Sequence, residues 1–209
     1  MKKIHIVLVL LSIASLLIWQ SCSKDDEDDK SGCISFKDSR DNQEYSVVKI
    51  GNQCWMAQNL NFTTSQDSWC YEEKESNCNK HGRLYSWSTA MEACPQGWEI
   101  PTETAWQTLE QNLGMSASVA AEDGWRGTNE AEKLKPNGST GFNVLISGKK
   151  GPGNTPFSDL DIFGYYWSAT SNQDVPEAWL RVFSPSESRI LKALYGKDYF
   201  FSVRCIKVE

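Results

Sequence analysis

The segment GRLYSWSTAMEACPQGWEIPTETAWQTLEQNLG, residues 82–114, decides the fold class because it predicts two successive helices. Its first half places Trp87, Ala90 and Cys94 at i, i+3 and i+7, which is the spacing of one helical face. Pro95 follows at once, and a proline just beyond the last apolar position ends a helix. The pattern predicts a helix that begins near Trp87 and ends at Cys94.

The second half of the segment carries helix signals at both ends. Thr102 is a good N-cap residue, because its side-chain oxygen can accept from a backbone N–H of the first turn. Trp106, Leu109 and Leu113 line one face, and Gly114 suits the position just after the C-cap. The pattern predicts a second helix between Thr102 and Gly114.

Strand signals flank these helices on both sides. A hairpin is predicted before them, with arms at residues 45–50 and 53–56. Glycines and turn residues after them separate further predicted elements, which are a short helix at 129–135 and strands at 142–147, 165–169, 178–183, 189–195 and 199–206. A hairpin, then helices, then antiparallel strands predict an α+β domain. Alternating βαβ units and a glycine-rich phosphate loop are absent from the sequence, which excludes a doubly wound nucleotide-binding fold.

The N-terminus predicts export and lipid attachment. Lys2 and Lys3 precede an apolar run at residues 4–19, and Cys22 follows directly after a small residue. This order resembles a bacterial lipoprotein signal peptide, whereas an ordinary secretory signal would end in an Ala-x-Ala-type site. The run is also short for a membrane-spanning helix. We expect removal of residues 1–21 and acylation of Cys22.

The sequence after the lipid cysteine divides into two parts. Residues 23–32, SKDDEDDKSG, are a charged run that cannot bury apolar area and stays solvated. The length of what remains suits one domain. The expected organisation is a signal peptide at 1–21, an acidic flexible tether at 22–32 and a single domain at 33–209.

The charge of the chain restricts its partners. The formal net charge is −6, and loss of residues 1–21 with their two lysines leaves −8. A basic stripe is absent, so we expect no nucleic-acid partner. The acidic balance also disfavours electrostatic docking on anionic lipid. Membrane attachment would then rest on acyl chains at Cys22, of which two or more anchor stably.

The cysteine count indicates a disulfide framework. Besides Cys22, six cysteines remain, and an even set in an exported chain predicts three disulfides among 15 possible connectivities. They are Cys33, Cys54, Cys70, Cys78, Cys94 and Cys205. Cys33 and Cys54 flank the predicted hairpin. The alternative is a zinc site, but after residue 21 the chain has one histidine, His81, and no Cys-x-x-Cys pair. We expect no metal ion and no other cofactor.

Several sequence blocks resemble one known family. They are GNQCWMAQNL (51–60), CY and C (70–71 and 78), GRLYSW (82–87), CPQGWEIP (94–101), STGF (139–142), YWSAT (166–170) and FSVRC (201–205). In this order they are similar to the blocks of the Fibrobacter succinogenes major paralogous domain family, from about residue 35 to residue 207. The chain departs from the pattern at Cys54, where a non-cysteine is usual, at Gln58, which replaces Glu, and at Glu99, which replaces the common His.

The resemblance implies a fold and a location. The fold would be similar to the C-type lectin-like domain, which formylglycine-generating enzymes share. The location would be the outer membrane of a Bacteroidetes-type bacterium, as a surface-exposed lipoprotein, because the acidic run after Cys22 is similar to the export signal of such lipoproteins. We expect the pairs Cys33–Cys54, Cys70–Cys78 and Cys94–Cys205, of which the first adds to the family's core disulfides. The family's role is not established, so fold alone gives no function.

The signals for catalysis are weak. His81 has no nucleophile nearby in sequence, and a lone histidine near a helix is more often structural. A Gly-x-Ser-x-Gly elbow is absent, and the acidic residues lie in polar loop sequence, where solvated charge is the default. An oxidase of the formylglycine type would need reactive cysteines, and none remains if all six pair. We therefore expect that the protein is not an enzyme.

Binding is the better-supported function at this level. Trp125 and Trp179 lie in or beside turn-rich sequence, next to Arg126 and Arg181. Flat rings and polar neighbours suit sugar faces and hydroxyls, so these four residues are the candidate site for a glycan or a surface protein. The calcium-lectin motifs Glu-Pro-Asn, Gln-Pro-Asp and Trp-Asn-Asp are absent; a weaker cation candidate is formed by Asp159, Asp161 and Asp174. The alternatives are a structural subunit of a surface assembly and a carbohydrate-active or oxidase enzyme.

Overall fold

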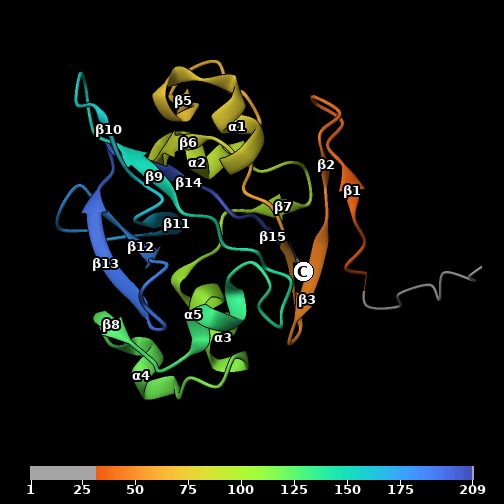
Figure 1. Cartoon of the computed structure of the whole chain (residues 1–209), viewed down its shortest axis with the longest axis vertical. Helices are drawn as coiled ribbons and strands as arrows, with labels where there is room; N and C mark the ends of the chain where they lie inside the picture. The colour runs from red at the N-terminus through yellow and green to blue at the C-terminus, as the bar shows by residue number, and fades with distance from the viewer. Residues whose placement is uncertain (1–31, 209) are drawn as a thin grey trace, which may run out of the picture.

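The computed structural model describes residues 32–208, so Cys22, the expected signal peptide and most of the tether lie outside the described residues. The fold is mixed α+β, with three sheets and five short α-helices in this part of the chain. Figure 1 shows α1 and α2 at one end, α3, α4 and α5 at the other, and strands β9, β11, β12, β13 and β14 of the largest sheet between them. Within residues 32–208, no helix combines the length and apolar character needed to cross a bilayer.

Three helices confirm the sequence predictions. The Ser86 hydroxyl accepts from the Thr89 backbone N–H at the start of α2, and the Thr102 hydroxyl accepts from that of Ala105 at the start of α3. These bonds satisfy donors that a helix start otherwise leaves without partners. The helices are a 3-10 turn at Tyr71–Glu73, α1 Glu75–His81, α2 Trp87–Ala93, α3 Glu103–Asn112, α4 Ala117–Ala121 and α5 Glu130–Leu134.

The strands form one large and two small sheets. Strands of the largest sheet follow the order β5-β6-β14-β9-β11-β12-β13-β8, and β10 pairs with β9 at the side. The smaller sheets have the orders β3-β4-β15-β7 and β1-β2. The strands are β1 Phe36–Lys37, β2 Glu44–Tyr45, β3 Val47–Ile50, β4 Gln53–Met56, β5 Ser68–Trp69, β6 Leu84–Ser86, β7 Trp98–Glu99, β8 Gly124–Arg126, β9 Ser147–Lys150, β10 Phe157–Leu160, β11 Gly164–Ser171, β12 Glu177–Phe183, β13 Ile190–Gly196, β14 Phe200–Ser202 and β15 Ile206–Lys207.

The largest sheet has a hydrophobic core on each face. Successive residues of a strand point to opposite faces, so Trp167 of β11 packs into one core and Tyr166 into the other. The first core includes Tyr85 and the second includes Trp106 of α3, and all of these rings are fully buried. Alternate residues along each strand of this sheet therefore lie on the same face.

Three disulfides join the pairs expected from the sequence. They are Cys33–Cys54, Cys70–Cys78 and Cys94–Cys205. The last joins the end of α2 to the segment between β14 and β15, across a sequence separation of 111 residues, whereas Cys70–Cys78 spans only 8. The long crosslink therefore constrains most of the domain.

Two predicted strands were wrong in their bounds, and the buried Arg204 connects the two segments concerned. Residues 142–146 form no strand, and the predicted strand at 199–206 is divided between β14 and β15, which belong to different sheets. Arg204 lies in the connection and is fully buried, where it donates to the carbonyls of Met56, Phe142 and Asn143. The carbonyls of Phe142 and Asn143 thus accept from a side chain, in a segment that has no strand partner.

Candidate functional site

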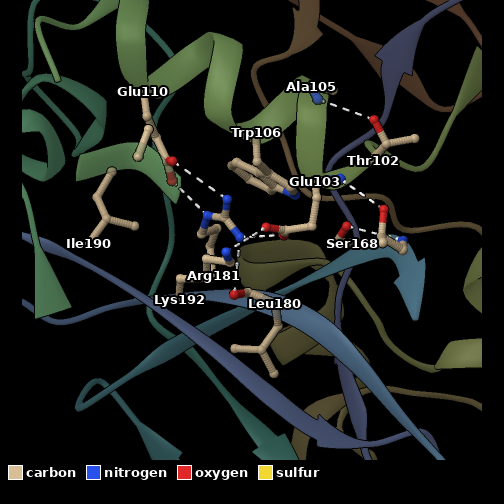
Figure 2. Close-up of polar contacts among 12 residues, drawn as sticks. Thr102, Glu103, Ala105, Trp106, Glu110, Ser168, Leu180, Arg181, Ile190 and Lys192 are labelled. Atoms are coloured by element: carbon tan, nitrogen blue, oxygen red, sulfur yellow. Dashed lines mark hydrogen bonds and ion pairs between the residues drawn. The ribbon is translucent and has the colours of Figure 1, made fainter. Parts of the chain in front are cut away.

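The candidate residues Arg126 and Arg181 lie in a buried cluster of charges between α3 and the largest sheet. Arg126 donates through Nη2 to both carboxylate oxygens of Glu110, at 2.8 and 2.7 Å. Arg181 donates through Nε to Glu110 at 2.6 Å and through Nη1 to Glu103 at 2.5 Å. Figure 2 shows the Arg181 guanidinium between these two carboxylates, beside the ring of Trp106. Both arginines are therefore occupied by protein groups.

This cluster corrects the prediction that Arg126 and Arg181 donate to a ligand. Arg181 and Glu110 are 0% exposed, and Arg126 is 3% exposed. Burial alone would lower the pKa of Arg181, but the Glu110 and Glu103 carboxylates raise it above its usual value. Burial lowers the pKa of Arg126, with the nearby Arg181 acting in the same direction. Two cations share one deeply buried carboxylate, an arrangement that attaches α3 to strands β8 and β12.

The two candidate tryptophans do not form one surface, which is a second correction. Both lie in strands rather than loops, Trp125 in β8 and Trp179 in β12. Trp125 pairs with Leu191 of β13, and Trp179 pairs with Leu194. Paired residues share a face and neighbours alternate, so Leu191 and Leu194 put the two rings on opposite faces. On its face Trp179 contacts Lys192, whose Nζ lies 4.4 Å from the ring centroid.

The face that carries Trp125 also carries a group of aromatic rings, of which all but Tyr165 are half-exposed. Its members, together called the aromatic face here, are Phe163, Tyr165, Tyr195 and Tyr199 with the charged pair Lys149 and Asp159. The ring centroids of Tyr165 and Tyr195 are 6.2 Å apart, and those of Tyr195 and Tyr199 are 4.9 Å apart. Phe201 packs beneath the last two rings. Tyr165 is itself buried, whereas part of each of the Phe163, Tyr195 and Tyr199 rings remains exposed.

A charged pair borders these rings. Lys149 Nζ lies 2.8 Å from an Asp159 oxygen, and the Tyr165 hydroxyl donates to the same carboxylate at 2.7 Å. Burial would raise the pKa of Asp159, but the bonds from Lys149 and Tyr165 lower it below its usual value. Burial raises the pKa of Tyr165, so its hydroxyl stays neutral at physiological pH. The group therefore offers a fixed carboxylate, an ammonium and a hydroxyl beside flat rings.

The cation candidate formed by Asp159, Asp161 and Asp174 is not supported. Asp159 is paired with Lys149, while Asp161 and Asp174 are exposed in turns on either side of β11. Among residues 32–208, the only group of at least three close potential metal ligands is Cys70, Glu75 and Cys78. Its two sulfurs are joined in a disulfide, so they are not thiolate ligands.

His81 ends α1 and is almost completely buried. Its backbone carbonyl accepts from the Asn59 amide at 2.8 Å and from the Ser147 hydroxyl at 3.3 Å. Burial lowers the pKa of the imidazole, and the charge of Lys80 lowers it further. Both hydrogen bonds are made by the backbone of His81.

The sequence analysis missed the aromatic face, although part of its signal was present. Leu191, Ala193 and Tyr195 alternate along the strand predicted at 189–195, which predicts one apolar face. Lys149 and Asp159 belong to a hairpin, β9 and β10, whose pairing brings them together. That pairing depends on register, which the sequence alone does not define here.

Comparison with known proteins identifies one family. The model of the Fibrobacter succinogenes major domain matches residues 48–207. No curated protein matches the chain, and no solved structure matches it either. Because the matched region covers well over half of the sequence, the chain belongs to the Fibrobacter succinogenes major domain family.

Proposed function

We propose that the chain is a non-catalytic binding module that takes a glycan on its aromatic face. The observation that carries this proposal is the set of half-exposed rings of Phe163, Tyr195 and Tyr199, supported from below and bordered by Lys149 and Asp159. Aromatic rings pack against the apolar faces of sugars, and fixed charged groups bond their hydroxyls. Rigid rings also lose little conformational entropy on binding.

The fold and the location in this proposal follow from the sequence resemblance. The fold would be of the C-type lectin-like type, and the mature protein would be a lipoprotein at the surface of the outer membrane. The order of Lys2, the apolar run and Cys22 supports lipid attachment. A protein ligand and a structural role in a surface assembly are the competing functions, and the glycan experiment below separates them.

Glycan binding should depend on the ring of Tyr195. Replacement by alanine is expected to weaken binding by about 1–2 kcal/mol, or roughly tenfold, as for an aromatic residue at the centre of a binding surface. Tyr195→Phe keeps the ring and should bind within about twofold of the parent, since it loses only one hydroxyl. The measurement is a glycan-array screen of the full chain, followed by titration of the best glycan.

Trp179→Ala is the matched control, because this half-buried ring lies next to Ala178, the partner of Tyr195 on the paired strand, and therefore on the opposite face. It should leave glycan affinity unchanged. Equal losses in Trp179→Ala and Tyr195→Ala would contradict the assignment of the aromatic face. An array without any bound glycan would reject the proposed function in favour of a protein ligand or an assembly role.

Lipid attachment at Cys22 is tested separately. We expect the parent chain to enter the detergent phase in Triton X-114 partitioning, and Cys22→Ala to remain in the aqueous phase because it has no thiol to acylate. Ser23→Ala is the control and should partition like the parent. Detergent partitioning of the Cys22→Ala chain would show that the anchor lies elsewhere.

A further inference from the structure

The Asp159 carboxylate at the border of the aromatic face has one oxygen bonded to protein groups and one that is not. Its Oδ2 accepts from the Tyr165 hydroxyl at 2.7 Å and lies 2.8 Å from Lys149 Nζ. Its Oδ1 has no hydrogen-bond partner within residues 32–208, and it does not belong to the buried polar atoms that lack one. Because the side chain is 25% exposed, Oδ1 is an acceptor that a ligand in solution can reach.

The Lys149 ammonium, by contrast, is surrounded by protein groups. Besides its contact with Asp159 it donates to the Tyr165 hydroxyl at 3.3 Å, and its Nζ lies 4.9 and 5.5 Å from the ring centroids of Tyr165 and Tyr195. Aromatic ring faces attract a cation at such distances. The Tyr165 hydroxyl accepts from the ammonium and donates to the carboxylate, so both of its bonding roles are used. Within this charged group, Asp159 Oδ1 is therefore the polar atom that remains for a ligand.

The charges around the exposed ring of Tyr195 are mainly negative once the ion pair is taken into account. Lys149 Nζ contacts both the Asp159 carboxylate and this ring, so a sugar packed on the ring can place a hydroxyl at Oδ1. On the other side, Asp198 lies beside Gly196, where a Cβ would be 2.7 Å from its Oδ1, and it has no ion pair among the described residues. Lys197 lies against another ring, with its Nζ 4.3 Å from the centroid of Trp87.

We propose that the aromatic face selects neutral glycans over anionic ones and that Asp159 determines this specificity. The inference rests on the glycan-binding function proposed above. A sugar hydroxyl can donate to Oδ1, and a hydrogen bond to an ionised acceptor is stronger than one to a neutral acceptor. A carboxylate of the ligand in the same place has no proton to donate and meets a like charge, while Lys149 is already paired with Asp159. Repulsion of the wrong ligand contributes to specificity as attraction of the right one does.

The test compares neutral glycans with carboxylate derivatives that are otherwise identical. The probes are maltopentaose, cellopentaose, mannopentaose, β-1,4-galactopentaose and the strongest neutral glycan of the array, each also in a form whose primary hydroxyls are oxidised to carboxylates. Isothermal titration of the full chain, in a detergent without a sugar headgroup, gives the affinities. Physiological ionic strength screens exposed charges beyond about 8 Å, so distant charges of the chain contribute little. At least one neutral probe should bind, and its oxidised form should bind roughly tenfold more weakly.

Asp159→Asn should change the specificity and not the affinity alone. Asparagine keeps the size of the side chain and tolerates the φ of 67° at this position, but it no longer neutralises Lys149. Neutral probes should bind roughly threefold to tenfold more weakly, because their hydroxyls lose an ionised acceptor. The oxidised probes should bind roughly threefold more tightly or better, because Lys149 becomes available to them.

Two further variants identify the cause of this change. Asp161→Asn removes the same charge from the same turn, at a φ of 59°, from an exposed side chain that has no ion pair with Lys149; it should keep the preference of the parent. Lys149→Gln added to Asp159→Asn should abolish the tighter binding of oxidised probes. Each preference is a ratio of two affinities measured on one preparation, so a variant that is partly unfolded still gives a valid ratio.

The possible failures of this inference and of the proposed function are distinguishable. If the parent binds an oxidised probe as tightly as its neutral form, the specificity is overturned while glycan binding stands. An unchanged ratio in Asp159→Asn, or the same change of ratio in Asp161→Asn, would also overturn the role of Asp159. Neutral binding that Tyr195→Ala does not weaken would assign the selection to another surface. If no probe binds at all, neutral or oxidised, the proposed function and this inference are rejected together.

Discussion

Glu110→Leu should lower the free energy of unfolding by about 3–5 kcal/mol. The reason is that Arg126 and Arg181 would keep their charges in a buried place without the carboxylate that both of them bond. Removing one member of a buried ion pair is far more costly than removing an exposed charge. Urea-induced unfolding followed by tryptophan fluorescence measures the loss. The melting temperature should fall in parallel, by roughly 2–4 °C for each kcal/mol.

Two further variants test the explanation. Glu92→Leu makes the same change at an exposed position of α2 and should alter stability by no more than about 0.5 kcal/mol. The triple variant Glu110→Leu, Arg126→Met, Arg181→Met removes the two unpaired guanidinium charges together with the carboxylate. It should be more stable than Glu110→Leu alone. If the triple variant is the least stable of the set, the loss in Glu110→Leu comes from packing and not from uncompensated charge.

The sequence predicts the elements around this cluster better than the cluster itself. Glu103 and Glu110 are seven residues apart, and the helix that contains them was predicted from Thr102 and Trp106. Arginine is usually exposed, so Arg181 was interpreted as a ligand donor. The run AWLRVF at 178–183 does contain a signal of burial, because Arg181 interrupts an otherwise apolar strand. Its partner Glu110 is 71 residues away, and only the tertiary structure brings the two together.

The candidate binding residues also depend on long-range pairing that the sequence does not show. The strand over Ile190–Gly196 was predicted within one residue at each end. The residues of β12 and β8 that lie on the same face as a given residue of this strand are determined by the pairing of the three strands. That pairing puts Trp125 and Trp179 on opposite faces, which no local pattern shows. The helix α1 was missed because its sequence is polar throughout, and the disulfide Cys70–Cys78 connects it to the preceding segment. Local patterns therefore predicted elements, while register and crosslinks determined the surfaces.

Removal of the Cys94–Cys205 disulfide is the second change with a large expected effect. The Cys94→Ala, Cys205→Ala variant should lose about 4–5 kcal/mol, because a crosslink across 111 residues removes much of the conformational entropy of the unfolded chain. The Cys70→Ala, Cys78→Ala variant is the matched control. Its crosslink spans 8 residues, so the same model gives a smaller loss of about 2–3 kcal/mol.

The slope of urea unfolding gives a second, independent measurement of this effect. An unfolded chain without the long crosslink is more expanded, and the slope m rises with the surface that unfolding exposes. We therefore expect the Cys94→Ala, Cys205→Ala variant to combine its lower stability with a larger m than the parent, under non-reducing conditions. The Cys70→Ala, Cys78→Ala variant should keep an m close to that of the parent, because its loop is short. Equal losses of stability and equal slopes in the two variants would mean that the long crosslink acts on the folded state alone, and would contradict the entropic explanation.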